Sequence, residues 1–130
     1  MELYTLVKCG LDLHGIRYIE ENGAFHMTMR SGPKKWRCLI TVNGDDIICC
    51  AQFPWSAGGA SLKELNMLNC TCSIGCFVLN AGHVVLRYGA ESTDPMEAGE
   101  LAVSLLKRCG DEVCRCWNRV YSIAGVGDGL

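Results

Sequence analysis

The sequence has no long run of apolar residues and no excess of charge of either sign. Its longest apolar stretch is Ile47–Ala51, which is much shorter than the ~20 residues that a membrane-spanning helix needs. The 12 basic and 14 acidic residues give a net charge of −2, whereas proteins that bind nucleic acid usually present a basic face. The first residues are acidic and amphipathic and do not have the basic start of a secretion signal. We therefore expect a cytoplasmic protein that contacts neither a membrane nor nucleic acid.

The sequence also lacks the common signatures of catalysis. It contains no C-x-x-C pair of the thioredoxin type and no G-x-S-x-G nucleophile motif. A cysteine hydrolase needs a histidine base beside its thiolate. The three histidines are instead predicted at ordinary surface positions, with His14 at a helix end, His26 on the polar side of a strand and His83 at a strand start. We expect a protein that is not an enzyme and uses no cofactor.

Cysteine, by contrast, is abundant, with ten residues in the chain. A small secreted protein could join such cysteines in disulfides. We expect no secretion signal here, and 49% of the residues are hydrophobic and available for a core. We therefore predict reduced cysteines that pack as small apolar side chains in a bacterial cytosol.

One short segment of the chain holds three of these cysteines, Cys70, Cys72 and Cys76. The spacing of the last two fits a zinc knuckle, although a fourth ligand would have to come from elsewhere. The other close pairs do not fit a metal site. Cys49 and Cys50 are neighbours in a predicted strand and point to opposite faces, and Cys114 and Cys116 lie about 200° apart around a predicted helix. A cysteine-dependent or metal-dependent activity centred on residues 70–76 therefore stays as an alternative, with Cys72 as its most accessible thiol.

Apolar residues at helical spacing predict three helices. The first covers residues 2–13, and a short second helix contains Leu62, Leu65 and Leu68. The last helix follows Asp94-Pro95, because aspartate is a good N-cap and proline is tolerated in the first turn. Gly110 interrupts this last helix at a point where it can kink or split.

Alternating apolar and polar residues predict six strands. Asn22-Gly23 and Asn43-Gly44 are typical of two-residue hairpin turns. All links between paired strands are too short for parallel crossovers, so the strands must pair antiparallel. The predicted order is α-ββββ-α-ββ-α, which is an α+β fold with a single antiparallel sheet packed by helices. We expect one domain over residues 1–130.

The central strands carry apolar side chains on both faces. A sheet with a second apolar face is usually covered there by a helix or by a partner. Trp55 follows Pro54, whose missing N–H ends strand pairing, and tryptophan is enriched at binding hot spots. A core aromatic at the sheet edge is the alternative role for Trp55. We predict a protein-binding surface that consists of Leu39, Ile48, Cys50, Phe53 and Trp55.

This order of elements, with several short pieces of sequence along it, resembles the YbjN family of bacterial proteins. The pieces are GIRY (15–18), the Asn-Gly-linked strands, Leu68-Asn69 before GCFVLN (75–80), and HVVLRYG (83–89). YbjN proteins are described as proposed regulators of sensory transduction, with the fold of type III secretion chaperones. The resemblance implies a non-enzymatic module of this fold, and it supplies no active-site residue. Secretion chaperones of this fold form dimers and bind extended segments of client proteins along exposed apolar surface.

The predicted function is that of a protein-binding module, a regulator or chaperone that acts through an apolar sheet surface. Its partner would be another protein or client, and we expect it to form a homodimer. A small-ligand sensor, with a pocket between the sheet and the last helix, is a further alternative.

Overall fold

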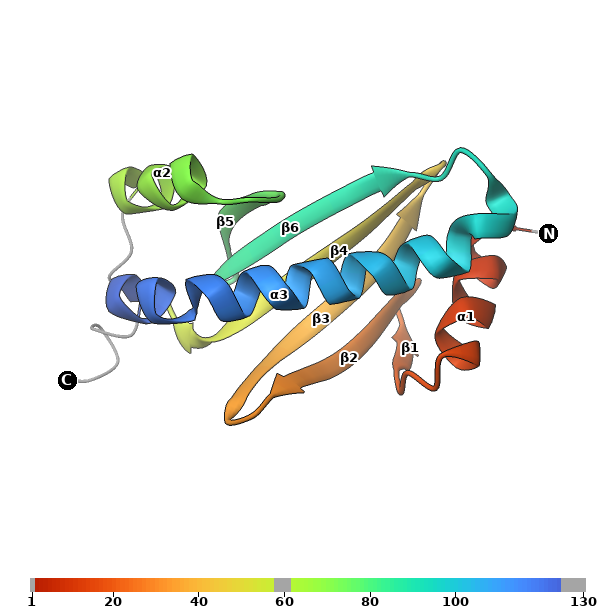
Figure 1. Cartoon of the computed structure of the whole chain (residues 1–130), viewed down its shortest axis with the longest axis horizontal. Coiled ribbons are helices and arrows are strands. Elements are labelled where there is room, and N and C mark those ends of the chain that lie inside the picture. The colour runs from red at the N-terminus through yellow and green to blue at the C-terminus, as the bar shows by residue number, and fades with distance from the viewer. Residues whose placement is uncertain (1, 58–61, 125–130) are drawn as a thin grey trace.

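The computed structural model describes residues 2–57 and 62–124. Figure 1 shows a twisted sheet with a long helix lying across it. In chain order the elements are α1 (Leu3–Leu13), β1 (Ile19–Glu21), β2 (Ala24–Ser31), β3 (Lys34–Asn43), β4 (Asp46–Ser56), α2 (Leu62–Thr71), β5 (Cys76–Asn80), β6 (His83–Glu91), the short 3-10 helix η1 (Pro95–Glu97) and α3 (Ala98–Ala124). The predicted order α-ββββ-α-ββ-α is confirmed.

The strands form one antiparallel sheet in the order β1-β2-β3-β4-β6-β5. The first four strands follow one another as a meander. The β5–β6 hairpin then folds back so that β6 pairs with β4, which places β5 at the edge of the sheet. The predicted fold class, α+β with a single antiparallel sheet, is confirmed.

Turn residues with positive φ connect the strands of the hairpins. Asn22 and Gly23 have φ of 54° and 74°, as a two-residue hairpin turn of this composition requires. The β3–β4 turn lies one residue later than predicted, because Asn43 still pairs with Asp46. Its first turn residue is Gly44, with φ of 62°, where a side chain would be strained.

The long helix α3 crosses one face of the sheet (Figure 1), and among the strands it contacts β4 and β6 most extensively. The alternate β4 residues Ile47, Cys49 and Ala51 are fully buried beneath it. A strand period of two and a helix period of 3.6 thus bring two apolar stripes face to face. Although α3 is 27 residues long, no helix in the described part of the chain is long and apolar enough to cross a membrane.

Two glycines set how closely α1 approaches α3. A Cβ atom on Gly10 would lie 2.3 Å from the Cα of Gly99, and one on Gly99 would lie 2.7 Å from the Cα of Gly10. Neither position can hold a side chain without moving a helix.

Gly110 neither splits nor ends α3, which runs unbroken from Ala98 to Ala124. A Cβ there would lie 3.2 Å from Cζ2 of Trp36, so this glycine makes room for the indole.

Candidate functional site

The two faces of the sheet differ in what covers them. The buried apolar residues of α1, α2 and α3 all join one core cluster, to which β4 contributes Ile47, Cys49, Ala51 and Phe53. The intervening β4 residues point the other way, and the described helices leave that second face uncovered. We call it the open face. Cross-strand pairing assigns to it Ile19 and Glu21 on β1, Ala24, His26, Thr28 and Arg30 on β2, Lys35, Arg37, Leu39, Thr41 and Asn43 on β3, Asp46, Ile48, Cys50 and Gln52 on β4, Val85, Arg87, Gly89 and Glu91 on β6, and Cys76 and Val78 on β5.

The centre of the open face is apolar. Leu39 and Cys50 are direct cross-strand partners, and Ile48 lies two residues from Cys50 on the same face of β4. All three side chains are part-buried by their neighbours in the sheet. Val85, on the same face of β6, is only 4% exposed and adds almost no accessible surface. The open face therefore presents a small apolar surface, Leu39, Ile48 and Cys50, on the side of the sheet opposite the core.

Cationic side chains flank this apolar centre. Arg37 and Arg87 are exposed, as is His26. Acidic side chains also lie on the open face, with Glu21 on the edge strand β1 and Asp46 beside the β3–β4 turn. Burial raises the pKa of the Cys50 thiol, while the positive charge of Arg87 acts in the opposite direction. The open face thus combines an apolar centre with a charged rim, in which arginines lie next to the Leu39–Cys50 pair.

Phe53 and Trp55 do not belong to the open face, and this part of the predicted surface is wrong. Phe53 is fully buried, because alternation along β4 places it on the helix-covered side with Ala51. Trp55 lies against α3, with its ring centroid 4.7 Å from that of Trp117 and 5.0 Å from that of Tyr121. The binding role of the remaining predicted residues, Leu39, Ile48 and Cys50, stays a prediction.

The three cysteines of residues 70–76 do not form a cluster. Cys70 is exposed on α2, and Cys76 is exposed at the start of β5. Between them the Cys72 thiol is part-buried and donates a hydrogen bond to the carbonyl oxygen of Ile74 at 2.6 Å. In the described ranges no group of three or more His, Cys, Asp or Glu side chains is placed to hold a metal ion.

The prediction that Cys72 is the most accessible of these thiols is wrong, because Cys70 and Cys76 are exposed and Cys72 is part-buried. Burial is the main cause that raises its pKa to about 11, so the thiol is protonated and a poor nucleophile near neutral pH. The prediction failed because a connecting loop is usually exposed, whereas this loop packs against α3.

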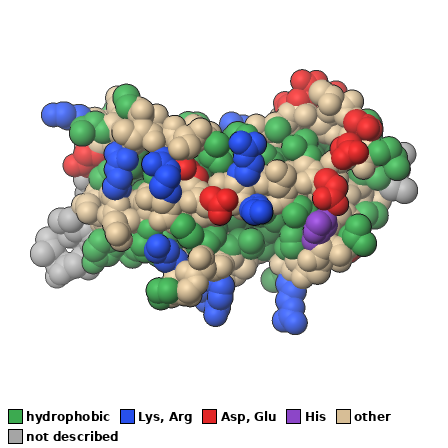
Figure 2. Space-filling model, in the orientation of Figure 1, with side chains coloured by type: hydrophobic (Ala, Val, Ile, Leu, Met, Phe, Trp, Pro, Cys, Tyr) green, Lys and Arg blue, Asp and Glu red, His purple; other side chains and the backbone are tan. Residues whose placement is uncertain are grey.

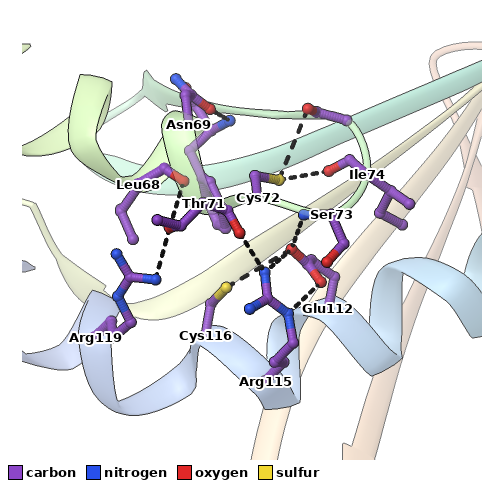
Figure 3. Close-up of polar contacts among 12 residues, drawn as sticks. Leu68, Asn69, Thr71, Cys72, Ser73, Ile74, Glu112, Arg115, Cys116 and Arg119 are labelled. Atoms are coloured by element: carbon purple, nitrogen blue, oxygen red, sulfur yellow. Dashed lines mark hydrogen bonds and ion pairs between the residues drawn. The ribbon is translucent and has the colours of Figure 1, made fainter.

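Glu112 of α3 holds this loop in place (Figure 3). Its carboxylate accepts a hydrogen bond from the backbone N–H of Ser73 at 2.7 Å and two from the Arg115 guanidinium at 2.8 and 2.6 Å. Arg115 also donates to the carbonyl oxygen of Thr71 at 2.8 Å. Hydrogen bonding by Arg115 is the main cause that lowers the pKa of Glu112 to about 2, and burial acts against it. This arrangement attaches the α2–β5 loop to α3.

Sequence reasoning missed Glu112 and also Asn69, the last part of the Leu68-Asn69 piece. The Asn69 amide donates to the Phe77 carbonyl at 3.1 Å and accepts from the Phe77 N–H at 2.6 Å, so it substitutes for a strand partner of β5. One signal was present for Glu112. It is a glutamate beside the apolar stripe of α3, three residues after Cys109 and four before Cys116.

The three histidines are not paired with thiols. Their partners are the Glu100 carboxylate for His14 at 2.9 Å, the Glu21 carbonyl for His26 at 3.3 Å and the Phe53 carbonyl for His83 at 3.1 Å. Within the described ranges, therefore, the structure does not assemble the thiolate and base of a cysteine hydrolase.

The helix-covered side of the molecule carries charges of both signs. In Figure 2 acidic side chains gather at the end where η1 and α1 lie, and lysines and arginines are interspersed with other side chains over the rest of the visible face. Around the start of α3 the acidic group includes Glu91, Asp94, Glu97 and Glu100. The visible face therefore has no continuous basic surface.

Comparison with known proteins identifies the fold. No family model matches the sequence, and no curated protein matches it. The crystal structure of YbjN, a proposed transcription regulator from E. coli, is 15% identical over 87% of this chain and 86% of that chain, with a TM-score of 0.63. The chain has the YbjN fold. This confirms the predicted fold.

A second similar structure is that of SycH, a type III secretion chaperone from Yersinia pestis, in complex with a stable fragment of YscM2. It is 14% identical over 85% of this chain and 99% of that chain, with a TM-score of 0.47. SycH therefore lies further from this chain in structure than YbjN does.

Proposed function

We propose that this protein is a non-enzymatic binding module that recognises another protein through the open face and forms a homodimer. The observation that carries the proposal is the apolar centre of the open face, Leu39, Ile48 and Cys50, which the described helices leave uncovered. Burial of apolar surface stabilises a protein interface by about 25 cal/mol per Å² before the costs of association. An apolar sheet face of this kind is therefore a natural contact for a partner.

Two arginines of the rim define the chemistry of the partner surface. Arg87 is the cross-strand neighbour of Cys50 on β6, and Arg37 lies two residues before Leu39 on the same face of β3, so both place fixed positive charges next to the Leu39–Cys50 pair. A partner that fits would place apolar side chains over this pair and acidic side chains beside the arginines, because such complementarity speeds association and excludes wrong partners. None of the direct neighbours of the Leu39–Cys50 pair in the sheet is acidic, so a protein partner with these features is the preferred occupant.

Three further parts of the proposal are the absence of catalysis, the role as a regulator and the location in the cytoplasm. The described histidines and cysteines form no nucleophile–base pair, which supports binding rather than catalysis. YbjN, whose fold the chain has, is described as a proposed transcription regulator, and a regulator acts by binding. All ten cysteines are free thiols, which suits a reducing compartment, so we place the protein in the cytoplasm of a bacterial cell.

The homodimer is tested by sedimentation velocity with a charged residue on the open face. At tens of micromolar the wild-type protein should sediment as a dimer, and Ile48→Asp should sediment as a monomer, because an unpaired carboxylate cannot be buried in an apolar contact. Ser104→Asp, at an exposed position of α3, is the matched control and should stay dimeric. A wild-type monomer, or an Ile48→Asp dimer as stable as the wild type, would contradict this part of the proposal.

The Cys50 thiol reports directly on whether the open face is covered. Its labelling by iodoacetamide should slow as the protein concentration rises through the dimerisation range, while labelling of Cys9, exposed on α1, should not change. Equal slowing at both thiols would show that the effect is not specific to the open face. Crosslinking in the native cell followed by peptide mapping then identifies the partner, and crosslinks confined to the helix-covered side would reject the open face as its site.

A further inference from the structure

β3 and β4 separate at one end of the sheet and leave a cleft. Their last paired residues are Arg37 and Gln52, although β3 begins earlier and β4 continues to Ser56. Pro54 has no N–H to offer to β3, and the register of β4 shifts so that Ser56 pairs with His83 of β6. The cleft has a volume of about 650 Å³, within the ~300–1,000 Å³ that is usual for small-molecule sites.

Aromatic residues line this cleft, namely Trp36, Phe53, Trp55 and Trp117. Phe53 is fully buried and Trp36 is 4% exposed, so the rings open to a ligand are those of Trp55 and Trp117, which are part-buried. The ring centroid of Trp117 lies 6.3 Å from that of Trp36, 5.9 Å from that of Phe53 and 4.7 Å from that of Trp55. Flat, rigid and largely apolar walls suit a flat apolar ligand, because aromatic side chains offer stacking and edge contacts at little cost in conformational entropy.

The polar residues of the cleft favour an anion. Lys35 and Arg37 line it together with His83, and no acidic side chain does so. The His83 ring donates through Nδ1 to the Phe53 carbonyl, which fixes its position. Positive charge without a neighbouring carboxylate is the arrangement that attracts and retains a carboxylate ligand.

One donor at the cleft is also without a partner. The indole N–H of Trp36 is buried and has no hydrogen-bond acceptor within the described part of the chain. A buried donor that stays unsatisfied costs roughly 1–3 kcal/mol, and most such donors in folded proteins find a partner. Nε1 is itself buried, so a ligand oxygen reaches it only if the surrounding side chains move.

We propose that this cleft binds a small organic anion with a flat apolar body and a carboxylate. The part-exposed aromatic rings hold the body, and the carboxylate lies among the basic side chains. This site shares Arg37 with the rim of the open face but includes none of its apolar centre, and the proposal does not depend on dimerisation or on a protein partner.

The test uses the indole N–H groups as probes. The chain has three tryptophans, so ¹⁵N-labelled protein gives a separate indole signal for each, and Trp55→Phe and Trp117→Phe identify the signal of Trp36. Titration with 2-naphthoate should shift the Trp36 signal saturably. 2-Naphthamide, which has the same ring without the charge, should bind about tenfold more weakly or less. An unshifted Trp36 signal, or equal affinity for the acid and the amide, would overturn the proposal.

Two neighbouring lysines supply the matched variants. Lys35 lines the cleft and Lys34 does not, so Lys35→Gln should weaken naphthoate binding about fivefold or more, and Lys34→Gln should leave it unchanged. Equal effects of the two substitutions would show general attraction to a basic region and reject the site. Ile48→Asp, which tests the open face, should retain full naphthoate binding, and its loss there would place the ligand elsewhere.

Discussion

Glu112 is a buried carboxylate, and burial without partners would favour its neutral form. It is 5% exposed, and it remains charged because Arg115 and the backbone N–H of Ser73 supply hydrogen bonds to both of its oxygens. Its pKa is lowered to about 2, whereas an unfolded chain has a glutamate pKa of about 4.3. A lowered pKa in the folded state stabilises the fold above the unfolded pKa. This stabilisation is lost as the pH falls from about 4.5 toward 2.

We predict that Glu112→Gln lowers the free energy of unfolding by about 1–3 kcal/mol at neutral pH, since the ion pair with the half-exposed Arg115 is lost while one amide contact to Ser73 can remain. Urea unfolding at a series of pH values measures the effect. The difference from wild type should shrink between about pH 4.5 and pH 2, where the carboxyl of the unfolded wild-type chain becomes protonated while that of the folded protein is still charged. Asp111→Asn, at the exposed neighbouring position, should change stability little throughout. A difference that is independent of pH would reject the charge of Glu112 as its cause.

At the scale of elements, the crossing of α1 and α3 depends on two backbones in direct contact. The Cα atoms of Gly10 and Gly99 occupy the space in which either side chain would lie. Both glycines are buried inside helices, where glycine costs up to about 1 kcal/mol relative to alanine. Close packing of α1 against α3 compensates for the low helix propensity of the two glycines.

We predict that Gly10→Ala destabilises the protein by about 1–3 kcal/mol, because the clash with Gly99 exceeds the gain in helix propensity. Thermal or urea unfolding measures the change. Cys9→Ala replaces the adjacent exposed residue of α1 and should alter stability by less than about 0.5 kcal/mol. A Gly10→Ala protein more stable than wild type would show that α1 moves away from α3 without cost.

The elements themselves could be predicted from the sequence because their signals are local. The Asn22-Gly23 turn and the cap at Asp94 are encoded within a few residues. The Asp94 carboxylate accepts from the Met96 N–H at 3.0 Å, although it caps the short helix η1, which leads into α3, and not α3 itself. The predicted binding surface failed in part, since alternation along β4 already places Phe53 on the side of the core. The burial of Cys72 depends on Glu112, forty residues further along the chain, and no local pattern in the sequence reports such a contact.

At the scale of the whole molecule, the ten cysteines follow the same division between core, loop and surface as the other residues. Four are buried, Cys38, Cys49, Cys109 and Cys116. Three are part-buried, Cys50, Cys72 and Cys114. The other three are exposed, Cys9, Cys70 and Cys76. Hydrogen bonds to Cys109 and Cys38, with burial, raise the pKa of Cys49. The cysteines are therefore distributed as small apolar residues are, and not as the ligands of one site.

This distribution predicts the outcome of a thiol titration. Ellman's reagent should react quickly with the three exposed thiols of the native protein and with all ten thiols after denaturation without reductant, because access limits the reaction of the buried ones. Cys70→Ser should remove one thiol from the fast phase. Cys72→Ser, two residues away, should leave the fast phase unchanged, because the wild-type Cys72 thiol is part-buried and its pKa is raised to about 11. A fast phase that loses one thiol in Cys72→Ser would show that the α2–β5 loop separates from α3 in solution, and fewer than ten thiols after denaturation would show disulfides.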